Sequence, residues 1–334
     1  MNWEIFGHEW AVNLLKENVA RGEVRHAYLF NGPQGIGRRT LALRLAQALN
    51  CPQPSAPGEP CRICRTCMQI ERMQHPDLAV IQSEQEGGVL KVDQIRELQR
   101  SLALHPYEAR YRVAVLLRFE EANLSAMNAL LKTLEEPAPQ VVLILTAENS
   151  ESLIPTIFSR CEVLRLNPLP FEQVSQWLHI RWKLPLEQAQ LLAHISFGRP
   201  GYALRMFQEP YRLEQRHAWL DEQTRLLSAN RVERFAYADS LAKDKEVLRS
   251  LLLLWLSYWR DVLLKSKRAS APLVNLDRTN EIEFLAARFD SRIAYQTVTA
   301  LKHVLILLER NINPRLAVEV LMLDLPYLKE KQVT

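Results

Sequence analysis

The sequence predicts an α/β domain built on a parallel sheet, followed by a small helical segment and an all-α domain. Short apolar runs alternate with segments of helical periodicity from the N-terminus to about Leu166, which is typical of parallel α/β folds. All ten glycines lie at or before Gly201, and the last third is rich in Leu, Ala, Glu and Arg, a composition that favours helical bundles. The 334 residues suffice for two or three domains.

The apolar runs have the length of β-strands, and several are apolar throughout. Strands that are buried on both faces of a parallel sheet have this pattern. The predicted strands are Ala27–Asn31, Leu78–Gln82, Arg112–Leu117, Val141–Ala147 and Glu162–Leu166.

Segments with apolar residues at helical spacing separate these runs. They include Arg39–Asn50, Val92–Leu104 and Ser125–Glu136. In the second segment, Val92, Ile95, Leu98 and Leu102 fall on one face, which predicts a helix that packs against the sheet.

The prolines of Asn167–Pro170 predict a linker, because proline discourages both helix and central strand. A small helical segment is expected from about Phe171 to Phe207. From about Tyr211 onward the pattern predicts long amphipathic helices.

A glycine-rich segment, Asn31–Thr40, follows the first predicted strand and opens the first of these helices. Its Gly32 and Gly37 fit the G-x-x-x-x-G part of a phosphate-binding P-loop, with Gly35 between them. Such a loop points backbone N–H groups at phosphate, assisted by the N-terminus of the helix.

The two positions after Gly37 depart from the motif. Arg38 stands in place of lysine, and Arg39 in place of the serine or threonine whose hydroxyl binds Mg²⁺. Arginine has no acceptor atom, and Thr40 comes one residue too late. We expect a loop without hydrolytic function. Nucleotide that is bound but not hydrolysed, or an unusual active site using Arg38 and Thr40, remain alternatives.

The acidic residues near the next strand end also depart from an ATPase pattern. An active motor carries an Asp-Glu pair directly at the strand end, whereas here Arg118 and Phe119 precede Glu120 and Glu121. The other interpretation of this pair is a solvated acidic helix start, which the helix dipole favours.

Four cysteines, Cys51, Cys61, Cys64 and Cys67, lie in an insertion between the P-loop helix and the second strand. Their spacing, C-x9-C-x2-C-x2-C, suits a tetrahedral, structural Zn²⁺ site with no open position for water. An iron–sulfur cluster or free thiols are the alternatives. Cys161 stands alone and is expected to be a small buried side chain.

The charge and hydropathy patterns indicate where the protein is located and which classes of partner it binds. The N-terminal residues show no signal peptide, and Leu251–Leu256 is too short to span a membrane, so we expect a cytoplasmic protein with reduced thiols and no membrane partner. The net charge of +4 is mild. Together with the lack of a basic recognition helix, it disfavours a zinc-dependent DNA-binding protein.

Three further stretches carry a family resemblance. They are Asn128–Pro137 (NALLKTLEEP), Ser159-Arg160-Cys161 and Asn313–Ala317 (NPRLA). With the P-loop-like segment and the cysteine insertion, they resemble the clamp-loader subunits of bacterial DNA polymerase III, an AAA+ family, over essentially the whole chain.

Two kinds of clamp-loader subunit share these features. The motor subunits gamma and tau keep an intact ATP site, whereas a second kind has a degraded one. Arg38, Arg39 and the missing Asp-Glu pair favour the second kind. So does Gly201, because motor subunits carry a nucleotide-sensing arginine there and Arg199 is out of register. An ATP-hydrolysing motor subunit is the alternative.

The resemblance implies an AAA+ α/β domain (1–166) with a zinc-binding insertion (51–67), a small helical lid (167–209) and a helical collar (210–334). The collar would hold a hetero-pentamer with gamma or tau motor subunits and the delta subunit, acting on the sliding clamp and primed DNA. The apolar stretch Leu248–Leu264, with Trp255 and Trp259, is then either the core of the collar or a surface facing another subunit.

Arg160 is the candidate catalytic residue. In clamp loaders similar to this chain, the Ser-Arg-Cys arginine points across the subunit interface at the neighbour's ATP. A planar, permanently charged guanidinium matches phosphate oxygens. The resemblance therefore implies an arginine finger that acts in trans. The other interpretation is a structural ion pair at a helix end.

Overall fold

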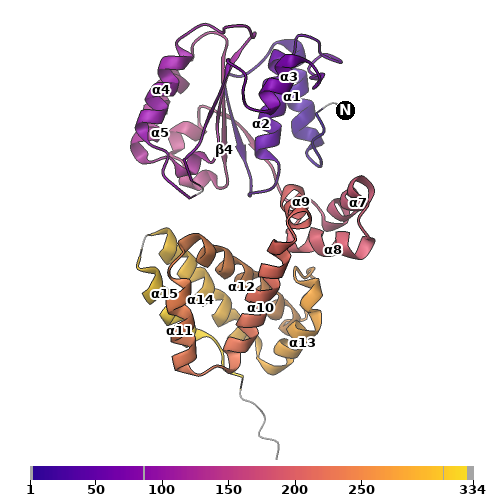
Figure 1. Cartoon of the computed structure of the whole chain (residues 1–334), viewed down its shortest axis with the longest axis vertical. Helices are drawn as coiled ribbons and strands as arrows, with labels where there is room; N and C mark the ends of the chain where they lie inside the picture. Colours follow the sequence, from indigo (N-terminus) through magenta and orange to yellow (C-terminus); the bar gives the residue numbers. More distant parts are fainter. Residues whose placement is uncertain (1–2, 86, 311, 329–334) are drawn as a thin grey trace, which may run out of the picture. The chain divides into compact units, whose positions relative to one another are not determined.

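The computed structural model describes residues 3–85, 87–310 and 312–328, and the chain divides into two compact units (Figure 1). The first unit runs to Gln173 and also includes Arg199–Tyr202. The second comprises Val174–Gly198 and the chain from Ala203 onward. The expected division into three domains at residues 166 and 209 stays a prediction.

The first unit is built on a parallel sheet of five strands within the described residues, in the order β2-β3-β4-β1-β5. All the predicted strands are present, and their limits differ by one residue at most. The strands are β1 (Ala27–Asn31), β2 (Leu78–Ile81), β3 (Arg112–Leu116), β4 (Val141–Ala147) and β5 (Glu162–Arg165).

Helices cover both faces of this sheet (Figure 1). Alternate residues of a strand point to opposite faces, so Tyr28 and Phe30 enter one core while Ala27 and Leu29 enter the other. The first core is shared with α1 (Glu9–Arg21), α2 (Arg38–Asn50) and α3 (Arg65–Glu71). The second is shared with α4 (Val92–Leu102), α5 (Leu124–Glu135) and α6 (Pro155–Phe158).

The predicted apolar face of α4 is confirmed. Ile95, Leu98 and Leu102 are buried in the second core, and Val92 packs against it. Short 3-10 helices follow two strands, η1 (Phe119–Glu121) after β3 and η2 (Ser150–Ser152) after β4.

The remaining described chain is helical, as the sequence predicts. The helices are α7 (Phe171–Trp182), α8 (Leu186–Ile195), α9 (Pro200–Gln208), α10 (Tyr211–Ser228), α11 (Arg231–Leu241), α12 (Lys245–Ser266), η3 (Leu276–Arg278), α13 (Thr279–Arg288), α14 (Ser291–Glu309) and α15 (Pro314–Asp324). The α/β fold class followed by helices is thus confirmed.

The long helix α12 is the centre of the helical core. Its Trp255 and Trp259 are fully buried among residues of α13, α14 and α15. The core interpretation of this apolar stretch therefore holds for both tryptophans. Leu253 of the same helix remains 42% exposed.

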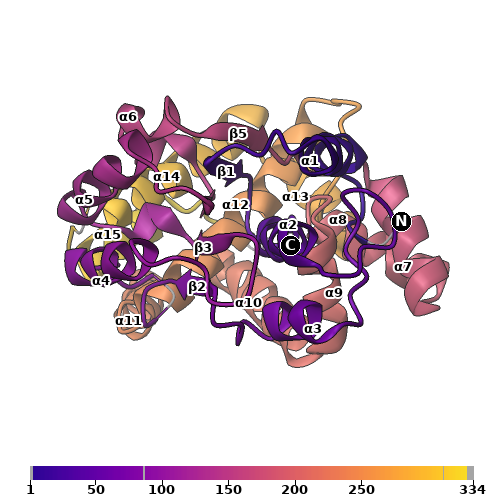
Figure 2. The same cartoon turned by 90° about the horizontal axis from the view of Figure 1, so that it is seen from above.

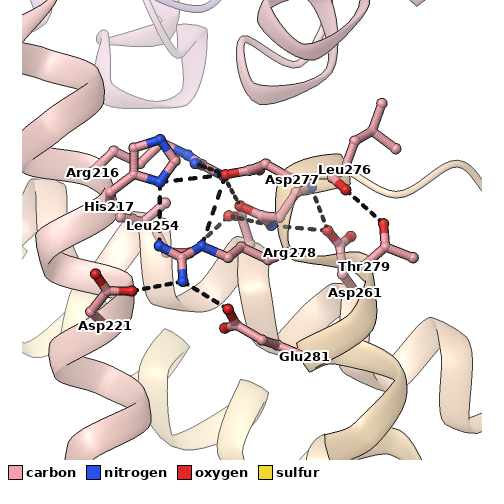
Figure 3. Close-up of polar contacts among 12 residues, drawn as sticks. Arg216, His217, Asp221, Leu254, Asp261, Leu276, Asp277, Arg278, Thr279 and Glu281 are labelled. Atoms are coloured by element: carbon pink, nitrogen blue, oxygen red, sulfur yellow. Dashed lines mark hydrogen bonds and ion pairs between the residues drawn. The ribbon is translucent and has the colours of Figure 1, made fainter. Parts of the chain in front are cut away.

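A buried polar network connects α10, α12 and η3 (Figure 3). Arg216 pairs with Asp277 at 2.7 Å and donates to the side-chain oxygen of Asn275. Asp261, which is fully buried, accepts hydrogen bonds from the backbone N–H groups of Val274 and Asn275. Because its members satisfy one another, this network fixes the loop between α12 and α13.

None of the helices in the described part of the chain combines the length and the apolar character that a membrane crossing requires.

Candidate functional site

The glycine-rich loop connects the end of β1 to α2, as predicted. Gly35 has a φ of 82°, and a Cβ at this position would come within 2.8 Å of Tyr202. A Cβ at Gly32 would come within 2.3 Å of the carbonyl oxygen of Leu166. Gly37 caps α2 in the left-handed conformation. Only glycine fits the two crowded positions, which is why glycines stand at these places in the loop.

The segment Arg199–Tyr202 closes over this loop within the first unit. The N–H of Gly201 donates to the carbonyl oxygen of Gly35 at 2.8 Å, and Arg199 donates to that of Gln34. The guanidinium of Arg199 also lies over the ring of Tyr202, 4.4 Å from its centroid. The loop is thus in contact with protein groups of its own chain at Gln34 and Gly35.

Arg38 does not extend into solvent from the start of α2. Its side chain is 8% exposed, with Nη1 4.0 Å from Oε1 of Glu120 and Nη2 3.6 Å from Oε1 of Glu148. Burial lowers the pKa of Arg38 and raises the pKa of Glu120, and the opposite charge of each partner counteracts this effect. A guanidinium therefore lies between two carboxylates where β1, β3 and β4 end.

Two polar atoms of this cluster lack a hydrogen-bond partner among the described residues. They are Nη1 of Arg38 and Oε2 of Glu120, both buried. The sequence did not single out Glu148. Its place directly after β4, at the edge where β1 also ends, was the signal that could have found it.

Arg39 and Thr40 stand apart from the Arg38 cluster. Both are exposed on α2, and Nη2 of Arg39 lies 3.2 Å from Sδ of Met73. Within the described residues, neither forms a hydrogen bond or an ion pair with Glu120 or Glu148. The loop thus presents no hydroxyl at the position where a P-loop holds Mg²⁺.

The interpretation of Glu120 and Glu121 as a solvated helix start is wrong. Their side chains are only 19% and 12% exposed, and they lie in the 3-10 helix η1. Glu121 pairs with Nε of Arg118 at 2.8 Å and accepts hydrogen bonds from the Ser83 hydroxyl and the N–H of Gly87. Internal partners, and not solvent, satisfy this carboxylate.

The four cysteines of the insertion come together. The sulfur atoms of Cys51, Cys61, Cys64 and Cys67 all lie within 4.8 Å of one another. Tetrahedral Zn²⁺ with bonds of ~2.3 Å places its sulfur ligands about 3.8 Å apart, and Sγ of Cys61 lies 4.0 Å from Sγ of Cys67. The donor set and its spacing fit one zinc ion.

Backbone groups support this cluster. The N–H groups of Cys61, Cys64 and Cys67 point at Sγ of Cys51, Cys61 and Cys64, each at 3.4 Å. Such N–H to sulfur contacts orient thiolate ligands around a metal. Cys51 ends α2 and Cys64 caps α3, so the cluster joins two helices that already pack together.

Arg160 lies two residues after the end of α6 and contacts the last residue of α5. Its Nη2 lies 2.7 Å from Oε1 of Glu135, and its Nη1 donates to the carbonyl oxygen of Thr156 and the hydroxyl of Ser159. The Arg160 side chain is 34% exposed and that of Glu135 is 50% exposed. A pair this exposed contributes about 0.2–1 kcal/mol to stability. The ion pair at a helix end exists, and part of the guanidinium still faces solvent.

Cys161, the neighbour of Arg160, is partly buried against the second core. Burial raises the pKa of its thiol to about 12, so it stays protonated near neutral pH. This agrees with the expected role as a small packed side chain.

Comparisons with known proteins identify similar sequences. Two family models match, "DNA polymerase III, delta subunit" over residues 7–170 and "DNA polymerase III, delta subunit, C terminal" over residues 210–326. The DNA polymerase III subunit delta′ of Pseudomonas aeruginosa is 37% identical over 63% of this chain and 63% of its own. The subunit delta′ of Bacillus subtilis is 34% identical over 55% of each chain.

A gamma subunit is also similar. The DNA polymerase III subunit gamma of a Buchnera aphidicola strain is 28% identical over 79% of this chain and 75% of its own. The alignments span less than two thirds of the length of the two delta′ relatives.

Proposed function

Because this chain belongs to the DNA polymerase III delta-subunit family and has delta′ subunits among its relatives, we propose that it is a non-hydrolysing subunit of a bacterial clamp loader. In this role it supplies Arg160 to the ATP site of a neighbouring subunit. The observation that carries the proposal is the position of Arg38 between Glu120 and Glu148, beside a loop that lacks its metal-binding hydroxyl.

Two features support the absence of ATP hydrolysis. In hydrolysing P-loop proteins a serine or threonine hydroxyl and a strand-end carboxylate hold Mg²⁺. Here Arg39 replaces the hydroxyl, and the nearby carboxylates Glu120 and Glu148 face the guanidinium of Arg38. A fixed internal cation disfavours binding of a second cation at the same carboxylates.

The proposed partners follow from the family. The chain would assemble with gamma or tau motor subunits and the delta subunit in a hetero-pentamer. The complex would load the sliding clamp on primed DNA. The proposed domains are an AAA+ domain (1–166), a lid (167–209) and a collar (210–334).

The proposed action of Arg160 is electrostatic. A guanidinium that contacts a neighbour's ATP stabilises the charge that develops on the transferred phosphoryl group. Its partly exposed side chain beside α6 supports this role, since an arginine that is enclosed by its own chain could not reach another subunit.

We assign the four cysteines to one Zn²⁺. Cys51, Cys61, Cys64 and Cys67 would hold it, and the ion would supply only a structural cross-link. The cluster would fasten the chain between α2 and α3 to the end of α2.

An ATP-hydrolysing motor subunit of the same complex is the second candidate. The similarity to a gamma subunit over 79% of this chain favours it. The replacement of the magnesium ligand by Arg39 opposes it.

Two measurements of ATP turnover decide between these candidates. We expect only background phosphate release from the isolated chain, and a faster rate when the chain joins motor and delta subunits from the same organism. Turnover by the isolated chain would support the motor subunit. A complex that forms without this chain and has the same ATPase rate would contradict the proposed role.

A further inference from the structure

We propose that Glu135 is a positioning residue for Arg160. It holds the guanidinium in place in advance, so that less side-chain freedom is lost when the guanidinium contacts the neighbour's phosphate in the transition state. This inference rests on the proposed role of Arg160 in trans.

The frame that brings the two residues together is rigid. Leu134 of α5 and Ile157 of α6 are buried in the same core, 2% and 0% exposed, and α5 and α6 are in contact (Figure 2). Glu135 follows Leu134 and Arg160 comes shortly after Ile157. The buried residues therefore fix the backbone, and the two charged side chains meet at the rim of the core.

The contacts of Arg160 leave part of its guanidinium available. Arginine carries five N–H donors. One on Nη2 faces Glu135, and those on Nη1 face the oxygen atoms of Thr156 and Ser159. Among the described residues, Nε and the second N–H of Nη2 have no hydrogen-bond or ion-pair partner. The group is thus anchored on one side and keeps donors for phosphate oxygens.

Stability does not explain a carboxylate at this position. Glu135 is the last residue of α5, where the helix dipole disfavours negative charge. The pair is also too exposed to contribute much to folding. Anchoring is of use to a long arginine side chain that acts on a neighbour, because a flexible arginine loses rotamer freedom on each engagement.

The test uses the reconstituted loader with wild-type chain, Glu135→Gln, Arg160→Ala and the double variant. Glutamine keeps the size of the side chain and removes its charge. We expect Glu135→Gln to slow the ATP site that faces this subunit on the order of 3- to 10-fold. The total kcat then lies between those of the wild-type and Arg160→Ala complexes. The KM for ATP stays unchanged, because the anchored contact acts in the transition state.

Glu136→Gln is the matched control. Glu136 is the adjacent carboxylate, it is exposed, and it forms no ion pair with any of the described residues. This variant is expected to behave as wild type. In the Arg160→Ala background Glu135→Gln should have no further effect, because a residue that acts through Arg160 has nothing left to position.

Each other outcome overturns the inference in a different way. If Arg160→Ala lowers the ATPase rate of the loader but Glu135→Gln leaves it unchanged or raises it, Glu135 does not position the arginine. The proposed role of Arg160 in trans is then still supported. If Glu135→Gln lowers the ATPase rate equally in the wild-type and Arg160→Ala backgrounds, Glu135 does not act through Arg160. If Arg160→Ala itself has no effect, the proposed function fails and the positioning role fails with it.

Discussion

Nη2 of Arg38 lies 3.6 Å from Oε1 of Glu148, although these residues are far apart in sequence and follow β1 and β4. The carboxyl ends of parallel strands meet at one edge of the sheet, which is where nucleotides bind in open α/β folds. In this chain the edge holds a cation that belongs to the protein. The first prediction depends on this arrangement.

We predict that the isolated chain does not turn over ATP, with or without primed DNA. The magnesium-binding hydroxyl is replaced by Arg39, and Arg38 lies beside the nearby carboxylates. Phosphate release by the purified chain should equal the background, and Arg38→Ala should not change it. Turnover that is lost in Arg38→Ala would show that the loop is an active site.

We predict about one tightly held Zn²⁺ per chain and negligible iron, as measured by elemental analysis, because four thiolates with this spacing suit a closed tetrahedral site. Cys64→Ser should lower the zinc content and loosen the insertion while most of the α/β core stays folded. Cys161→Ser is the control, since Cys161 is not part of the four-sulfur cluster, and it should retain the metal. Brown protein with charge-transfer absorbance would contradict the zinc assignment.

We predict that Arg216→Ala destabilises the helical unit by about 3–5 kcal/mol. The substitution leaves Asp277 and the side-chain oxygen of Asn275 without their buried partner. The matched control is Arg225→Ala on the same helix. The side chain of Arg225 is 50% exposed and pairs with Glu222. Its replacement should lower the free energy of unfolding by about 1 kcal/mol or less. Urea unfolding followed by the fluorescence of the buried tryptophans measures both. Equal shifts of the two midpoints would refute a special role of the network.

Much of the fold could be predicted because it depends on local patterns. The strands β1, β3 and β4 are buried on both faces along most of their length and leave apolar runs in the sequence. Shorter runs predict β2 and β5 within a residue of their observed ends. The cysteine cluster could be predicted because its members lie close together in sequence. The positions of Glu148 and Glu135 could not. Each acts through an arginine on another element, Arg38 or Arg160, and the sequence pattern does not show which carboxylate lies beside which arginine.

The alternative interpretation of Glu120 and Glu121 as a solvated helix start fails for the same reason. A pair of glutamates before a helical pattern is most often a solvated helix start, favoured by the dipole. Here the short helix η1 turns these residues toward Arg38, Arg118 and Ser83 instead. Only the tertiary structure supplies those partners.

The ATPase rate of the reconstituted loader with Arg160→Ala tests the central claim most directly. The account predicts a folded variant with normal zinc content and normal assembly by gel filtration, since the lost ion pair is largely exposed. The ATPase rate should fall in part, because one site loses its arginine, and Arg160→Lys should restore little, because an ammonium lacks the bidentate fork. A folded, assembled Arg160→Ala complex with an unchanged ATPase rate would contradict the account.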